Sequence, residues 1–161
     1  MIIKSKNSFG FELEILDKDK NVISSIDDFF EKMKLLKKEL ENYVKSEIRE
    51  LAPNFSFIAG EDVALMLLSH AGSLKNLAKM SASTIQLLGS EKALFRHLKS
   101  GKKAKPPKHG VIYNSPYIKN APPELRGKIA RIFASKISLA IKIDFYTQRD
   151  ERENLKKRLI R

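Results

Sequence analysis

His97 and His109 are the side chains best suited to acid–base chemistry, and each has cationic residues close by in the sequence. Paired histidines near a lysine such as Lys108 can transfer protons in phosphodiester cleavage. The pattern is not specific, because the two histidines lie twelve positions apart across a Pro- and Gly-containing loop and no acidic orienting residue lies nearby. We therefore keep a small ribonuclease as the weaker alternative and expect no catalytic residue.

Metal and thiol chemistry has little support in this chain. The sequence contains 3 His and no Cys, which excludes disulfides, thiolate metal sites and a cysteine nucleophile. His70 lies in an apolar run with no second ligand type three or four residues further on, so we interpret it as a packing residue. We expect neither a metal site nor a cofactor.

Charge is segregated along the chain. The net charge is +12, with 10 basic and 13 acidic residues in positions 1–72 but 21 basic and 6 acidic in positions 73–161. A strongly basic half is typical of proteins that bind phosphates, since each neutralised phosphate releases counterions. An anionic membrane surface would satisfy the charge equally well, although no apolar run reaches the roughly 20 residues of a membrane span. The lysine-rich segment 100–110 could also be a solvated loop.

The residues that lie between the basic side chains indicate how a nucleic acid would be recognised. Between Lys75 and Arg131 there are 13 basic and 2 acidic residues, interleaved with small and polar side chains rather than aromatic ones. This composition favours contacts with the backbone and shape of a nucleic acid over the base-stacking platforms of single-strand binders.

The elements that must position these residues are mostly helices. Alternating apolar residues from Phe9 to Ile15 predict a strand, with Val22–Ile23 as a returning strand and Ile2–Ile3 as a third, so residues 1–25 should form a small β-hairpin appendage. Residues 26–51 predict one long amphipathic helix ended by Pro53. Its apolar stripe either packs against the body or forms one arm of a coiled coil.

Residues 52–161 predict a helical domain, which makes the fold class mainly α. The expected helices cover 61–72, 74–79, 84–88 and 91–99, with Ser90 as the N-cap of the last. Residues 100–123 should be irregular because of their prolines and glycines. A long helix should begin at Pro122–Pro123 and continue through Asp144, followed by a charged, frayed helical tail from Arg149 to Arg161.

Five blocks of this sequence resemble the Nop domain. They are Leu51–Asn54, Leu74–Met80, Ala82–Leu98, Pro106–Tyr113 and Arg126–Arg131, which occur in that order over roughly residues 48–148. The chain looks most like the archaeal Nop scaffold protein of box C/D ribonucleoproteins. It is related to the eukaryotic nucleolar pair and more distantly similar to the spliceosomal Prp-type member.

The resemblance implies a non-catalytic, all-helical scaffold in guided RNA 2'-O-methylation. Such a scaffold binds a kink-turn RNA already occupied by its kink-turn-binding protein, in the archaeal cytoplasm or the eukaryotic nucleolus. Basic side chains suit phosphates, whereas Ser, Gln and His can bond or stack on sugars and bases. The positions that fall in the family's RNA-approaching segments are Lys79, Ala82, Ser83, Gln86, Lys92, Arg96, His97, Lys99, Lys108, His109, Arg126, Lys128 and Arg131.

The N-terminus departs from the family pattern. Archaeal members carry a fibrillarin-binding domain and a two-helix coiled coil for dimerisation, whereas only about 50 residues precede Leu51. Both features cannot fit in that length, which puts fibrillarin binding and dimerisation in doubt. The alternative function is a stand-alone basic RNA-binding or helix-pairing protein without a role in methylation.

Overall fold

The computed structural model describes residues 3–6, 12–15, 19–101 and 103–157, and these are mainly helical. The chain divides into two compact units, Met1–Tyr43 and Val44–Arg161. In the part of the chain that the model describes, no helix has the combination of length and apolar character needed to cross a bilayer.

Two short strands pair near the N-terminus. Strand β1 (Ile3–Lys6) runs antiparallel to β2 (Glu12–Ile15), with Ile3 opposite Ile15. The predicted return strand at Val22–Ile23 is wrong, since both residues belong to a helix. Their spacing to Ile26 continues the helical period of the following segment, and that longer pattern decides the local structure. Phe9 and Phe11, on which the strand prediction also rested, lie outside the described residues.

Helix α1 (Lys20–Leu51) has 32 residues and begins six residues before the predicted start at residue 26. Its apolar side chains alternate at spacings of four and three, which places them on one face. We call this set of residues the α1 stripe, and it consists of Val22, Ile26, Phe29, Met33, Leu36, Leu40 and Tyr43. Ile26 is the least exposed residue of the stripe, and 48% of its surface is still exposed.

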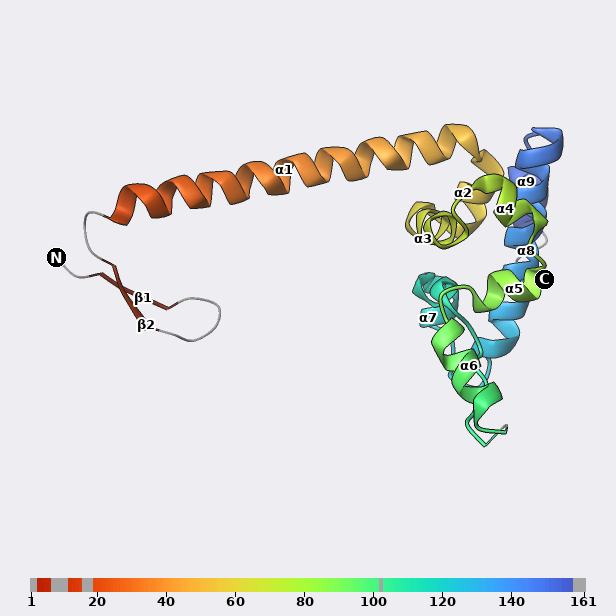
Figure 1. Cartoon of the computed structure of the whole chain (residues 1–161). Helices are drawn as coiled ribbons and strands as arrows, with labels where there is room; N and C mark the ends of the chain where they lie inside the picture. Colours follow the sequence, from red (N-terminus) through yellow and green to blue (C-terminus); the bar gives the residue numbers. More distant parts are fainter. Residues whose placement is uncertain (1–2, 7–11, 16–18, 102, 158–161) are drawn as a thin grey trace. The chain divides into compact units, whose positions relative to one another are not determined.

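Every element described in the unit 44–161 is helical (Figure 1). Helix α8 packs against α2, α4, α5 and α7 and so forms the centre of this unit. The elements are α2 (Pro53–Ala59), α3 (Glu61–Ala71), α4 (Leu74–Lys79), α5 (Ala82–Leu87), α6 (Glu91–Lys99), the 3-10 helix η2 (Val111–Asn114), α7 (Pro116–Lys119), α8 (Arg126–Lys142), the π-helical turn η3 (Ile143–Thr147) and α9 (Arg152–Lys157).

Helix α8 buries one face rich in small residues. Ala130, Ala134 and Ala140 are fully buried together with Phe133 and Ile137, and alanine lets neighbouring helices approach closely. The helix begins at Arg126, four residues after the predicted start at Pro122. The prolines form a turn instead, in which the backbone N–H groups of residues 125 and 126 both donate to the Pro122 carbonyl oxygen.

Two other predicted segments differ from the structure, and one predicted N-cap lacks its side-chain hydrogen bond. Pro53 ends α1 but also begins α2, because proline fits the first position of a helix, and this second helix was not predicted. The segment 100–123 contains η2 and α7, each only four residues long and too short for a periodic signal. Ser90 stands at the N-cap of α6, yet its hydroxyl donates to the Leu87 carbonyl oxygen rather than capping the helix.

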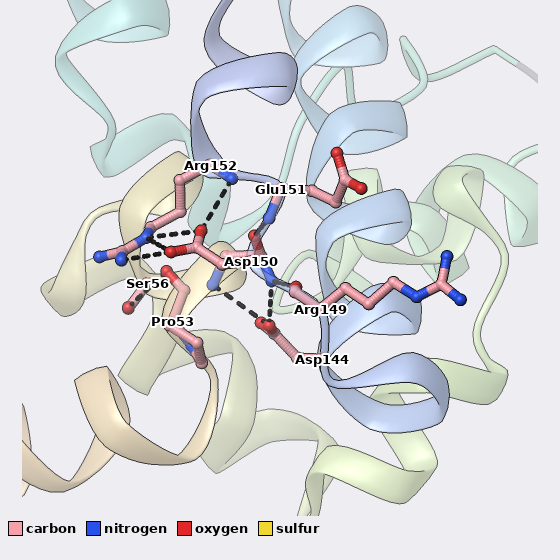
Figure 2. Close-up of polar contacts among 8 residues, drawn as sticks. Pro53, Ser56, Asp144, Arg149, Asp150, Glu151 and Arg152 are labelled. Carbon is pink, nitrogen blue, oxygen red and sulfur yellow. Dashed lines mark hydrogen bonds and ion pairs between the residues drawn. The ribbon is translucent and has the colours of Figure 1, made fainter.

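The carboxylate of Asp144 caps α2 from 90 residues away (Figure 2). It accepts hydrogen bonds from the Phe55 backbone N–H at 2.8 Å and from the Asn54 backbone and side-chain nitrogens at 3.2 and 2.6 Å. The Asn54 amide also donates to the Arg149 carbonyl oxygen, and its oxygen accepts from the Glu151 N–H, each at 2.7 Å. Burial raises the pKa of Asp144, while these hydrogen bonds oppose that rise.

Candidate nucleic-acid interface

The loop that carries Lys108 and His109 is bound to the end of α5. The Gln86 side-chain amide donates to the Lys108 carbonyl oxygen at 2.7 Å, and the Gly110 N–H donates to the Gln86 carbonyl oxygen at 2.8 Å. The Val111 N–H completes the ladder by donating to the Leu88 carbonyl oxygen at 2.8 Å. The structure therefore brings together predicted residues from two segments that are separated in the sequence.

Gly110 is required by the closeness of this contact. A Cβ atom added at residue 110 would lie 1.9 Å from the Leu88 carbonyl oxygen, far inside van der Waals contact with rigid backbone. Any side chain would therefore push the loop away from α5 and displace Lys108 and His109 with it.

His109 and Arg126 meet at the ring of Tyr113. The His109 and Tyr113 rings stack with centroids 4.6 Å apart and planes inclined by 15°, and the Arg126 Cζ atom lies 5.6 Å from the Tyr113 centroid. Burial and the nearby Arg126 charge lower the pKa of His109. The lowered pKa favours the neutral imidazole, which suits stacking or hydrogen bonding better than ion pairing with phosphate.

Helix α6 presents cations on an exposed surface. Lys92, Arg96 and Lys99 are exposed, and no residue of α6 is buried. His97 differs from them, because its Nδ1 atom is hydrogen-bonded to the Ala104 carbonyl oxygen. His97 thus holds the turn after α6 and keeps only Nε2 for a ligand.

The turn between α4 and α5 carries the next predicted group. Ser81 caps α5 by accepting from the Thr84 N–H at 3.1 Å, and its hydroxyl lies 2.8 Å from that of Ser83. Lys79 and Ser83 are exposed and Ala82 is half-buried. The small side chains of this turn leave room for a partner to approach the protein backbone closely.

Many of the predicted cations have no anionic partner within the part of the chain that the structure describes. Among the described residues, ion pairs join other side chains, within α1, between α1 and α3, and at the start of α9. Unpaired exposed cations retain their full capacity to neutralise phosphates. This set, which we call the unpaired cations, is Lys79, Lys92, Arg96, Lys99, Lys108, Lys128 and Arg131.

The arrangement does not support joint catalysis by the two histidines. His97 is engaged by Ala104 and His109 is stacked on Tyr113, and within the described residues no contact joins the two imidazoles. Two residues that organise the surface were not predicted, Tyr113 and Ala104. Ala104 acts through its backbone carbonyl group, which leaves no signal in the sequence. The sequence shows an aromatic residue four positions after His109, but its contact with His109 cannot be inferred without the geometry of the loop.

A helical domain that exposes many cations and carries an ordered basic loop belongs to a class typical of nucleic-acid-binding proteins. The family model described as "Nop: snoRNA binding domain, fibrillarin" matches residues 1–160. The chain therefore belongs to the Nop family, as the five sequence blocks predicted.

Relatives in archaea and eukaryotes agree. An uncharacterised NOP5 family protein of Methanocaldococcus jannaschii is 46% identical over 160 residues, covering 96% of this chain and 37% of the relative. Nucleolar protein 58 of Schizosaccharomyces pombe is 38% identical over 148 residues, covering 92% and 29%. Human nucleolar protein 56 is 38% identical over 147 residues, covering 89% and 24%. The chain thus spans about a quarter to just over a third of these relatives' lengths.

A solved structure shares the fold. A chain in the crystal structure of a fibrillarin/Nop5p complex superposes with a TM-score of 0.68 at 29% identity. The match covers 86% of this chain and 53% of that one.

Proposed function

We propose that this protein is a non-catalytic RNA-binding scaffold of a box C/D-type ribonucleoprotein. It recognises a kink-turn RNA together with the bound kink-turn protein, in the context of guided 2'-O-methylation. The observation that carries the proposal is the ordered group of Gln86, Lys108, His109 and Arg126, in a chain of the Nop family that also exposes the unpaired cations.

The surface chemistry favours recognition of a shaped, double-stranded phosphate backbone. Exposed Lys and Arg side chains supply affinity that does not depend on base sequence. The neutral ring of His109 and the hydroxyl of Ser83 add a few groups that can bond or stack on a sugar or an unpaired base. A surface of this kind gives modest affinity for bare RNA, and a protein already seated on the RNA would add the rest of the interface.

Fibrillarin is a second candidate partner of this chain. The matching family model names it, and the solved structure that shares the fold is a fibrillarin/Nop5p complex. The family match includes residues 1–50, which supports fibrillarin binding despite the small number of residues before Leu51. Co-purification of the full chain with fibrillarin, in the presence and absence of RNA, tests this partner separately from RNA binding.

The main proposal is tested by a gel-shift titration of kink-turn RNA with and without its kink-turn protein. The expected result is a supershift of the preformed complex at protein concentrations that leave bare RNA largely unbound. Added stretches of non-cognate duplex RNA serve as the competitor that removes non-specific binding.

The α1 stripe supports a second candidate function, helix pairing. A heptad-spaced row of exposed apolar residues is typical of a helix that packs against another helix. Sedimentation equilibrium of the full chain over a range of concentrations tests this function. Association that is lost in Leu36→Asp but kept in Lys38→Asp, an exposed neighbour outside the stripe, would support pairing through α1, and a monomer at all concentrations would contradict it.

A further inference from the structure

Tyr113 connects η2 to His109 in the preceding loop and to Arg126 at the start of α8. It belongs to η2, is half-buried and packs against the hydrophobic core. Its ring is stacked on His109 and lies beneath the Arg126 guanidinium. No hydrogen bond of its hydroxyl is found within the described part of the chain, so the ring alone carries these contacts.

Arg126 is held in place rather than being a flexible surface cation. Its Nε donates to the Ala121 carbonyl oxygen at 2.9 Å, and its Nη2 donates to the Lys119 carbonyl oxygen at 3.3 Å. A guanidinium has five N–H donors, so three remain for a ligand. With the Tyr113 ring against it, the group is fixed in position before any ligand arrives, and less entropy is lost on binding.

His109 depends on the same ring. The backbone of His109 belongs to a loop. Among the described residues, Tyr113 is the one whose aromatic ring contacts the His109 imidazole. The stack covers one face of the imidazole and contributes to the burial that lowers the pKa of His109. Loss of the ring would expose the imidazole and separate it from Arg126.

We propose that Tyr113 is a positioning residue of the RNA-binding surface, whose ring holds the His109 imidazole and the Arg126 guanidinium in the arrangement that meets the RNA. This inference rests on the proposed function and deepens it. The role requires an aromatic ring and not the phenol hydroxyl, so phenylalanine should replace tyrosine without loss and leucine should not.

The first arm of the test uses the free protein. Proton NMR follows the His109 ring during a pH titration of wild type, Tyr113→Phe, Tyr113→Leu and Arg126→Gln. We expect Tyr113→Phe to keep the wild-type chemical shift and the lowered pKa, since the ring current and burial remain. Tyr113→Leu and Arg126→Gln should each raise the pKa of His109 toward its ordinary value of about 6.5. Arg126→Gln keeps this arm decisive if Tyr113→Leu does not fold.

The second arm measures binding to the kink-turn RNA–protein complex in a salt series. Tyr113→Leu should bind roughly tenfold more weakly and lose up to about one unit of salt slope, the change expected of Arg126→Gln. The two backbone hydrogen bonds of the guanidinium remain in Tyr113→Leu, but the ring that fixes its orientation is gone. Tyr113→Phe should bind as wild type. The double variant should lose less than the product of the two single losses.

The outcomes separate the two claims. If wild type binds and Tyr113→Leu changes neither the His109 titration nor the salt slope, the positioning role is wrong. A loss of binding in Tyr113→Phe would also overturn it, because the hydroxyl would then contact RNA directly. If the pKa of His109 changes with the Tyr113 substitutions as expected but wild type does not bind the complex, the ring contacts of Tyr113 are supported and the proposed function fails.

Discussion

The Gln86 side-chain amide donates a 2.7 Å hydrogen bond to the carbonyl oxygen of Lys108, 22 residues further along the chain. This bond joins the end of α5 to the loop, beside the two backbone hydrogen bonds that the Gly110 and Val111 N–H groups donate to Gln86 and Leu88. Gln86 therefore helps to order the loop, and one of its two amide N–H groups is engaged by the Lys108 carbonyl oxygen rather than available to RNA. Two of the predicted RNA-binding residues thus form one unit.

Gln86→Met should loosen this loop while keeping the volume of the side chain. We expect RNA-complex affinity to fall about 2- to 10-fold, the worth of one net hydrogen bond of about 0.5–1.5 kcal/mol. The salt slope should not change, because no charge is removed. Hydrogen exchange of the Gly110 and Val111 amides in the free protein provides the check. Faster exchange at both amides is expected, and unchanged exchange with weaker binding would instead indicate a direct contact of Gln86 with RNA.

His109 makes the stability of the protein depend on pH. The folded state lowers the pKa of His109, so the unfolded chain binds that proton more tightly. The stabilisation from the neutral ring is complete above the unfolded pKa of about 6.5 and is lost as the pH falls through the lower folded value. The melting temperature of wild type should therefore decrease more between about pH 7.5 and pH 5 than that of His109→Gln. Parallel curves for the two proteins would contradict the lowered pKa.

The cations of α6 should contribute to affinity through phosphates. Replacing Lys92 and Arg96 together with Ala should weaken binding at low salt and reduce the salt slope by about two units, one for each lost contact. The matched control is Lys37→Ala with Lys38→Ala, two exposed cations on α1, where the slope should stay at the wild-type value. A double α6 variant with an unchanged slope would remove α6 from the interface.

Asp144 should matter for stability and not for RNA. Asp144→Ala removes the acceptor of three hydrogen bonds and leaves buried donors of Asn54 and Phe55 unpaired, a cost of about 3 kcal/mol in the free energy of unfolding. Asp150→Asn is the control. Its exposed carboxylate, whose pKa the Arg152 hydrogen bonds lower to about 2, should contribute far less. Urea unfolding measures both, and equal effects of the two substitutions would show that the buried cap does not stabilise the domain.

The sequence predicted the helices whose apolar residues recur over several turns. Helices α4 and α6 have the predicted ends, and α3 has the predicted start. Short elements such as η2 and α7 have too few residues to show a period, so they were missed. The start of α2 depends on the distant Asp144 carboxylate, and such a tertiary cap leaves no local pattern.

The candidate site was predictable in composition but not in geometry. The basic blocks and their resemblance to the Nop domain indicated which segments carry the surface. The sequence could not show that Gln86 and His97 use their side chains to hold neighbouring backbone, or that Tyr113 joins His109 to Arg126. Each of these contacts depends on how a loop returns to a helix, which residue types alone do not determine.

The most direct test of the central claim is a gel-shift titration of box C/D kink-turn RNA at two salt concentrations, with and without the archaeal kink-turn protein. A composite surface predicts a supershift of the RNA–protein complex at concentrations where bare RNA stays free, and a preference that persists at the higher salt. Equal binding to bare, complexed and unrelated RNA, abolished by salt, would contradict it and make this chain a general polyanion binder.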